Sequence, residues 1–308
     1  MNTLRVRLQK LLATCVSALI PAREARHRVR YCLHPLNDRR CVAYFKRRYV
    51  ERTPPAALPV ERRREPSAGV EYIWQCWLQG EERMPALVRR CLDSVRRHVA
   101  PGQQVVLVTE ANYADYVALP EGITALRRAG RIADAQFSDL LRVWLLSAYG
   151  GFWIDATCLM TAPIPESISR AGFFVFHSEG EFGYTLIQSC FIRAAAGNYL
   201  ICRWRQLMEE LWASDARLLH YFQLHLMFKA MVEADPVAHE EYGRMARVGE
   251  APTHVLQGYM KEGRAYDGKL MAEAAGGSFI HKLTYKIKPD GGAHPPTFTD
   301  RLWNGPEP

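Results

Sequence analysis

The pattern that most constrains the fold is a strand–helix–strand order between residues 70 and 110. Residues 70–77, VEYIWQCW, are rich in β-branched and aromatic side chains, which predicts a strand. Residues 84–99 space their apolar side chains as an amphipathic helix does, and residues 103–110, QQVVLVTE, predict a buried strand of the parallel type. This order predicts an α/β fold with a mostly parallel sheet, in which ligands bind at the strand ends.

The same pattern continues along the chain. Residues 135–149 predict a helix that ends at the glycine pair Gly150–Gly151, and residues 152–156, FWIDA, predict the next strand. Two more strands and then two more helices are predicted, over residues 172–178, 186–194, 199–212 and 218–234.

Basic charge is concentrated at the start of the chain. The 308 residues have a net charge of +8, but residues 1–69 alone hold 16 Lys and Arg against 5 Asp and Glu. The rest of the chain is therefore slightly acidic, which argues against nucleic acid as its partner. Thr3 to Ile20 combines leucines at helical spacing with basic side chains, which predicts an amphipathic helix. That helix either packs on the main domain or lies on an anionic membrane surface.

A proline-rich stretch follows the basic segment. It holds four prolines between residues 54 and 66 and the arginine run 62–64, which are typical of a linker, and we place a boundary near Ser67. We expect a basic, helical N-terminal segment with its linker over residues 1–69. An α/β domain over 70–290 and a C-terminal tail over 291–308 complete the chain.

Cysteine usage points to a reducing compartment. The eight cysteines form no C-x-x-C pair, which argues against a zinc site, and they lie scattered through apolar segments as reduced thiols do. No apolar stretch approaches the roughly 20 residues of a membrane-spanning helix. The N-terminus also lacks the cleavage pattern of a secretory signal. We therefore expect a cytoplasmic protein.

One acid stands out at the end of the strand that follows the glycine pair. Asp155 comes directly after Phe152, Trp153 and Ile154, and a carboxylate in such apolar surroundings is costly to bury without a partner. At a strand end it can bind a divalent cation and, through the cation, a diphosphate. The structural alternative is an aspartate that caps a turn.

The preceding helix carries a second pair of charged residues. Asp139 and Arg142 lie three residues apart on the side opposite the core stripe, together with Val143 and Leu146. A helix that is apolar almost all round is buried on both sides. The pair is therefore either a local ion pair or part of a polar site that faces a ligand.

Residues 138–157, SDLLRVWLLSAYGGFWIDAT, resemble the signature of the DXD-type sugar transferases of glycosyltransferase family 32, in particular the bacterial capsular polysaccharide synthesis branch. The segments 72–112 and 279–286, FIHKLTYK, are similar to flanking parts of that family, and the resemblance covers Val70 to Lys288. It implies the GT-A fold, which binds nucleotide sugars. It also implies a glycosyltransferase that moves a sugar from a nucleotide-sugar donor to a polysaccharide or glycolipid acceptor, with a UDP-sugar as the expected donor and GDP-mannose as the alternative.

The resemblance implies roles for individual residues. Asp155 matches the first acid of the DXD motif, which meets the metal and the donor, and Asp139 and Arg142 match an acid and a base that grip the donor sugar. Trp74 matches an aromatic residue that stacks on the nucleobase. Asn112 matches a position that contacts the nucleoside.

The late segment matches the region that closes over the diphosphate. There His281 is expected as a second metal ligand beside Asp155, with Lys282 and Lys286 placed to meet phosphate. The expected ion is Mn or Mg. The motif departs from the family pattern because Thr157 replaces the second acid, and a neutral hydroxyl is a weaker ligand than a carboxylate.

The resemblance further implies retention of configuration, and a front-face displacement is compatible with the absence of a carboxylate that must be a covalent nucleophile. We expect the basic N-terminal segment to hold the protein on the inner face of the membrane. Residues in the half that shapes the acceptor pocket are Glu179, Glu181, Tyr184, Ser189, His220, Tyr221 and His225. Two alternatives remain open from the sequence: a non-catalytic binding protein on a degenerate transferase scaffold, and an enzyme that transfers a sugar phosphate.

Overall fold

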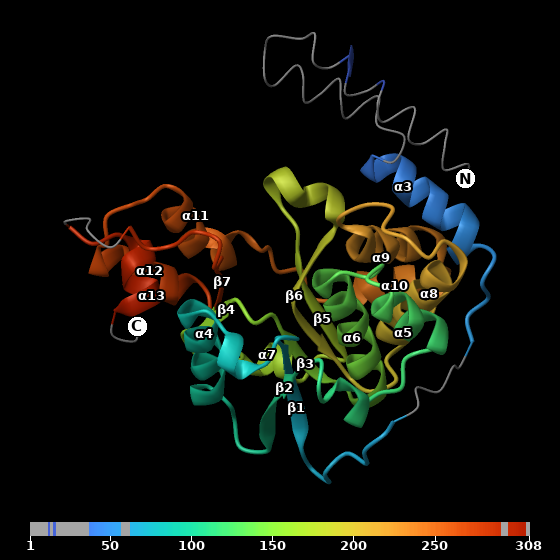
Figure 1. Cartoon of the computed structure of the whole chain (residues 1–308), viewed down its shortest axis with the longest axis horizontal. Coiled ribbons are helices and arrows are strands. Elements are labelled where there is room, and N and C mark those ends of the chain that lie inside the picture. The colour runs from blue at the N-terminus through green and yellow to red at the C-terminus, as the bar shows by residue number, and fades with distance from the viewer. Residues whose placement is uncertain (1–11, 13–14, 17–36, 57–61, 291–294, 306–308) are drawn as a thin grey trace.

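The computed structural model describes residues 12, 15–16, 37–56, 62–290 and 295–305, and it shows one central sheet with helices on both faces (Figure 1). The sheet has five strands in the order β2–β1–β3–β6–β5. β1 pairs in parallel with β2 and β3, whereas β6 runs antiparallel to β3 and β5. Only β6 therefore opposes the common direction, and the predicted α/β fold with a mostly parallel mixed sheet is confirmed. The strands are β1 Glu71–Cys76, β2 Gln103–Val108, β3 Gly151–Ile154, β5 Phe173–His177 and β6 Ile187–Ala194.

One face of the sheet is covered by a layer of long helices, on the right of Figure 1. The side chains of Trp74, Trp153 and Ile192 point into this layer and join its hydrophobic core. Alternate residues along each strand face the two sides of the sheet, so the same strands supply the opposite core as well. The helices are α5 Glu121–Arg128, α6 Asp134–Tyr149, α8 Tyr199–Ser214, α9 Gln223–Ala234 and α10 Pro236–Arg244.

The other face packs against α4 (Ala86–Arg97), α7 (Glu166–Ser169) and a short two-stranded ribbon. The ribbon pairs β4 (Cys158–Met160) with β7 (Ile280–Lys282) in antiparallel fashion. Three late helices then pack around α4 at the left of Figure 1, and they are α11 Val255–Lys261, α12 Gly268–Gly277 and α13 Phe298–Asn304.

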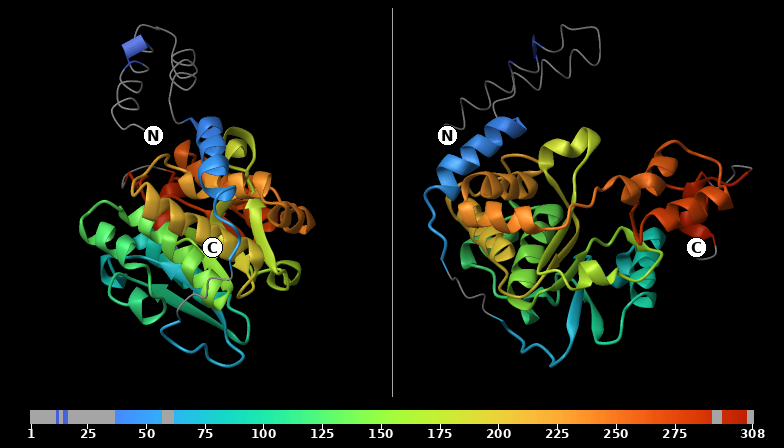
Figure 2. Two further views of the ribbon diagram at one scale, coloured as in Figure 1. Left: turned by 90° about the vertical axis from the view of Figure 1, so that its right-hand side faces the viewer. Right: turned by 180° about the vertical axis from the view of Figure 1, so that it is seen from behind.

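The N-terminal part of the described chain belongs to the main core. α3 (Asp38–Phe45) and the π-helical turn η1 (Lys46–Val50) pack on α9 and bury Phe45 and Tyr49. Figure 2 shows α3 at the end of the molecule opposite α11–α13. The basic helix predicted over Thr3 to Ile20 lies outside the described residues except for positions 12, 15 and 16. Within the described chain, no helix has the length and apolar character that crossing a membrane requires.

The glycine pair sets how β3 enters the sheet. Gly150 and Gly151 have φ angles of 69° and 90°, a region that other residues rarely adopt. A Cβ atom on Gly151 would lie 2.1 Å from the carbonyl oxygen of Tyr72 on β1. A Cβ atom on Gly150 would lie 2.5 Å from the backbone nitrogen of Ala196. Only glycine therefore lets β3 lie directly beside β1. This places Asp155, which follows β3, at the edge of the sheet where the carboxyl ends of β1 and β3 lie.

Candidate functional site

A cavity of about 500 Å³ opens at that edge, where β1 and β3 end and the antiparallel β6 begins. The end of β3, one side of α6 and the segment after β7 form most of its wall. The carboxyl ends of neighbouring parallel strands are where open α/β sheets bind their ligands. The cavity is therefore the leading candidate for the functional site.

A cluster of four charged side chains forms one end of the cavity. Arg142 lies between two acids, with its Nη2 3.1 Å from Asp139 Oδ1 and 3.3 Å from Asp155 Oδ1. Lys282 Nζ lies 2.6 Å from the other oxygen of Asp155, Oδ2. The indole of Trp153 donates a further hydrogen bond of 2.8 Å to Asp155 Oδ1. Both oxygens of Asp155 are thus engaged by donors or cations of the protein.

The surrounding structure holds this cluster in place. Arg142 is 5% exposed, donates to the carbonyl oxygen of Ser189 at 2.7 Å and also bonds the hydroxyl of Ser189. Its guanidinium lies 5.0 Å from the centroid of the Trp153 ring, which permits a cation–π contact. The backbone nitrogen of Asp155 donates to the carbonyl of Cys190 at 2.8 Å. The charged end of the cavity is therefore rigidly preorganised.

The two acids of the cluster differ in pKa. Burial raises the pKa of Asp139 to about 6, because the nearby Arg142 only partly compensates for the loss of water. For Asp155, burial also favours the neutral form, but the attraction of Lys282 and Arg142 outweighs it and lowers the pKa below its usual range. Burial acts against the charge of Lys282, yet Asp155 raises the pKa of that ammonium. Asp155 and Lys282 are thus a fully ionised pair near neutral pH.

A second part of the cavity wall, the aromatic end, holds two aromatic rings. Trp77 and Tyr285 both line it, with their ring centroids 5.5 Å apart and their planes at 83°. The buried Nε1 of Trp77 has no hydrogen-bond partner within the described residues. Lys286 lines the cavity next to Tyr285. The sequence prediction missed Trp77, although it lies in the same aromatic run as Trp74.

The structure does not bring Trp74 and Asn112 to the cavity. Trp74 is fully buried under α6, and its Nε1 donates to the carbonyl of Gly150 at 3.0 Å. The side chain of Asn112 instead stabilises the end of β2, since it accepts from the backbone of Thr109 at 2.7 Å and donates to that of Leu107 at 2.9 Å. Both side chains are thus satisfied by the fold itself.

His281 also lies apart from Asp155. It precedes Lys282 on β7, and successive side chains of a strand point to opposite faces. Its Nε2 hydrogen-bonds the hydroxyl of Thr161 at 3.0 Å, and burial lowers its pKa to about 4. Over the residues that the structure describes, no group of three or more His, Cys, Asp and Glu side chains could hold a metal. With Asp155 already paired to two cations, the residues present do not fit a divalent ion.

The acceptor-side residues predicted from the sequence fall into two groups. Ser189, Tyr221 and His225 line the cavity, while the other four predicted positions, Glu179, Glu181, Tyr184 and His220, do not. Burial lowers the pKa of His225 to about 3, so its imidazole is neutral at physiological pH. The Nδ1 atom of His225 finds no hydrogen-bond partner in the described chain. This rim of the cavity therefore offers a neutral polar group beside an exposed tyrosine.

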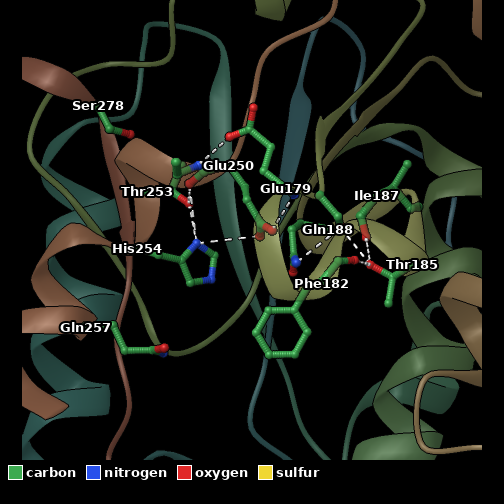
Figure 3. A network of polar contacts seen from close by, with 12 residues as sticks. Glu179, Phe182, Thr185, Ile187, Gln188, Glu250, Thr253, His254, Gln257 and Ser278 are labelled. Carbon is green, nitrogen blue, oxygen red and sulfur yellow. Dashed lines mark hydrogen bonds and ion pairs between the residues drawn. The ribbon is translucent and has the colours of Figure 1, made fainter. Parts of the chain in front are cut away.

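A polar network ties together the two segments beside this rim (Figure 3). Glu179 donates its backbone N–H to Glu250 Oε1 at 3.0 Å, and Glu250 Oε2 lies 3.7 Å from the imidazole of His254. Gln188 and Gln257, drawn in the same view, line the cavity from β6 and α11. The network thus holds the segment before α11 against the end of β5.

Three comparisons relate the chain to known proteins. The model of the family described as "Capsular polysaccharide synthesis protein" matches residues 43–302. The chain is 29% identical over 168 residues to "O-glycosyltransferase braB" of Annulohypoxylon truncatum. That match covers 48% of this chain and 39% of the relative, so the chain spans well under half of the relative's length. Among solved structures, "PaToxG Glycosyltransferase" aligns over 97% of this chain and 95% of that chain, with 12% identity and a TM-score of 0.38.

Proposed function

The chain belongs to the capsular polysaccharide synthesis protein family, and from this premise we propose that it is a glycosyltransferase. The proposed reaction moves a sugar from a nucleotide-sugar donor, a UDP-sugar in the first instance, to a polysaccharide or glycolipid acceptor. The observation that supports it best is the buried cluster of Asp139, Arg142, Asp155 and Lys282 at the strand ends. The printed name of the fungal relative, an O-glycosyltransferase, agrees with the proposal.

Each part of the donor has a counterpart in the cavity wall. Asp139 and Arg142 suit the sugar hydroxyls, because a carboxylate and a guanidinium form charge-assisted hydrogen bonds to them. Lys282 and Lys286 suit the diphosphate. The nucleobase is flat and apolar on its faces, and Trp77 supplies a matching surface at the aromatic end of the cavity.

The proposed chemistry is a front-face displacement with retention of configuration. The bond between the anomeric carbon and the β-phosphate oxygen breaks, and the anomeric carbon bonds to the acceptor hydroxyl oxygen. The proton of that hydroxyl passes to the leaving diphosphate. Asp155 holds its neighbouring cations through both of its oxygens, which suits a fixed countercharge rather than a covalent nucleophile.

The rim beside α9 supports a carbohydrate acceptor. Tyr221 is 66% exposed and Phe182 37% exposed, and both rings pack against Phe222. Exposed aromatic rings offer flat surfaces for the C–H faces of pyranose rings. The neutral imidazole of His225 lines the cavity on this side and suits a hydrogen bond to the acceptor hydroxyl.

We also propose that the protein acts in capsule or surface polysaccharide synthesis on the cytoplasmic face of the membrane. The excess of basic residues in the first 69 positions supports contact with anionic lipid. The seven cysteines within the described residues are all free thiols, which agrees with a reducing compartment.

The proposal is tested by incubating the purified chain with UDP-glucose, UDP-galactose, UDP-N-acetylglucosamine or GDP-mannose and a set of oligosaccharide and glycolipid acceptors. Mass spectrometry of the products should show an added sugar without phosphate and an equal amount of nucleoside diphosphate. A product that retains phosphate, with release of nucleoside monophosphate, would identify a sugar-phosphate transferase instead. If the protein neither binds nor turns over any donor, that result would favour the non-catalytic scaffold.

A further inference from the structure

We propose that Lys282 stands where a divalent cation would otherwise bind, so that the donor diphosphate is held without a metal. This inference rests on the proposed function and concerns how the same cavity neutralises the leaving group. A GT-A enzyme with a complete DXD motif would present two carboxylates to an ion. Here the motif supplies one carboxylate, Asp155, and Lys282 Nζ already lies 2.6 Å from it.

The charge balance of the cluster supports a cationic role for the protein itself. Asp139 and Asp155 carry two negative charges, and Arg142 and Lys282 carry two positive charges within 3.3 Å of them. Lys286 on the same wall adds a further positive charge. The four charges of the cluster cancel, so Lys286 leaves this wall with a net positive charge, which disfavours a divalent ion and favours a diphosphate. The charged end of the cavity is thus complementary to the diphosphate as it stands.

Lys282 is held in this place by the backbone on both sides. In the β4–β7 ribbon it lies directly opposite Cys158, and the backbone of Cys158 donates to the carbonyl of Asp155 at 2.9 Å. The next residue, Leu283, donates its N–H to the carbonyl of Thr157 at 2.8 Å. The lysine and the motif Asp155-Ala156-Thr157 therefore form one hydrogen-bonded unit. The short ion pair follows from this backbone geometry.

The ammonium group of Lys282 also has enough N–H donors to bind both Asp155 and a diphosphate. Lysine offers three N–H donors, and the contact with Asp155 uses one of them. The side chain is 22% exposed and lines the cavity, so the remaining donors can reach phosphate oxygens. Asp155 then acts as a positioning residue that keeps Lys282 charged and oriented.

The test measures nucleotide binding by isothermal titration calorimetry with UDP, GDP, CDP and ADP, in buffer with excess EDTA and in buffer with Mn²⁺. We expect at least one of them to bind, with Kd values in the two buffers within about threefold of each other. Binding that needs Mn²⁺ would overturn the inference and leave the proposed function intact. No binding in either buffer would count against both.

The lysine itself is tested with Lys282→Met, and Lys288→Met serves as the matched control because Lys288 is exposed and does not line the cavity. In EDTA we expect the first variant to lose at least tenfold in affinity for the diphosphate and the second to match wild type. Added Mn²⁺ should restore part of the affinity lost in Lys282→Met, because Asp155 can then bind the ion. Unchanged affinity in Lys282→Met would overturn the inference. If that variant does not fold, Lys282→Arg, which keeps the charge, must retain metal-independent binding.

Discussion

The two ends of the cavity are built in different ways. At the charged end, Asp155 is held by ion pairs and an indole hydrogen bond, so its geometry is set before any ligand arrives. At the aromatic end, Tyr285 is 36% exposed and Trp77 has a buried nitrogen without a partner in the described chain. A preorganised charged site suits the reacting diphosphate and sugar, because fixed dipoles need no rearrangement in the transition state. The aromatic end offers ring faces, which suit recognition of a nucleobase.

The largest expected effect comes from removing the charge that organises the charged end. Asp155→Asn keeps the shape but leaves Arg142 and Lys282 without their shared countercharge, and breaking a buried ion pair in this way is strongly destabilising. We expect kcat/KM for the donor to fall about a thousandfold, or roughly 4 kcal/mol. Steady-state kinetics measures this change.

The matched control for this variant is Glu166→Gln, which removes an exposed carboxylate on α7 that does not line the cavity. It should leave both kcat/KM and the melting temperature at their wild-type values. Retention of activity within tenfold in Asp155→Asn would contradict the role of the charged end.

A smaller effect concerns the pH dependence of stability. Burial raises the pKa of Asp139 from 3.8 to about 6. Between these two pH values the folded protein keeps a proton on Asp139 that the unfolded chain has lost. The resulting stabilisation is present below about pH 4 and disappears as the pH rises through about 6. Relative to Asp139→Asn, the wild type should therefore lose up to about 3 kcal/mol of unfolding free energy between about pH 4 and 7. Urea unfolding of both proteins across this range measures the difference, and parallel curves would refute it.

The smallest effect separates two tryptophans three residues apart. Trp77→Ala should weaken nucleoside diphosphate binding about tenfold, near 1.4 kcal/mol, because it removes a surface for the base. Trp74→Phe should instead lower stability without changing affinity, since Trp74 is fully buried in the core. Calorimetry for the first and thermal unfolding for the second give the two readouts. Equal losses of affinity in both variants would show that the cavity does not distinguish them.

Much of the fold follows from local pattern. Periodicity alone predicts β1 over residues 70–77 and α6 over 135–149, and the structure places them at Glu71–Cys76 and Asp134–Tyr149. The β4–β7 ribbon could not be predicted in this way, because its strands have three residues each and pair across more than a hundred positions. The four helices α10–α13 were missed too.

The site shows the same division between local and distant information. Asp139, Arg142 and Asp155 lie in one continuous segment, and the structure brings all three together. Trp74 and Trp77 look alike in sequence, and only the structure, through the burial of Trp74 and its bond to Gly150, shows which one the core uses. Similarly, the alternation of β7 sends Lys282 to Asp155 and His281 to the opposite side, a choice that depends on pairing with β4.

The central claim is that the cavity beside Asp155 binds a nucleotide sugar through its diphosphate. The most direct measurement is a crystal structure of the protein grown with the nucleoside diphosphate that binds most tightly, in the presence of EDTA. We predict the diphosphate in contact with Lys282, the sugar space bordered by Asp139 and Arg142, and the base against Trp77. A nucleotide bound elsewhere would contradict the account, whereas a diphosphate at Asp155 only after a metal is added would contradict only the metal-free binding.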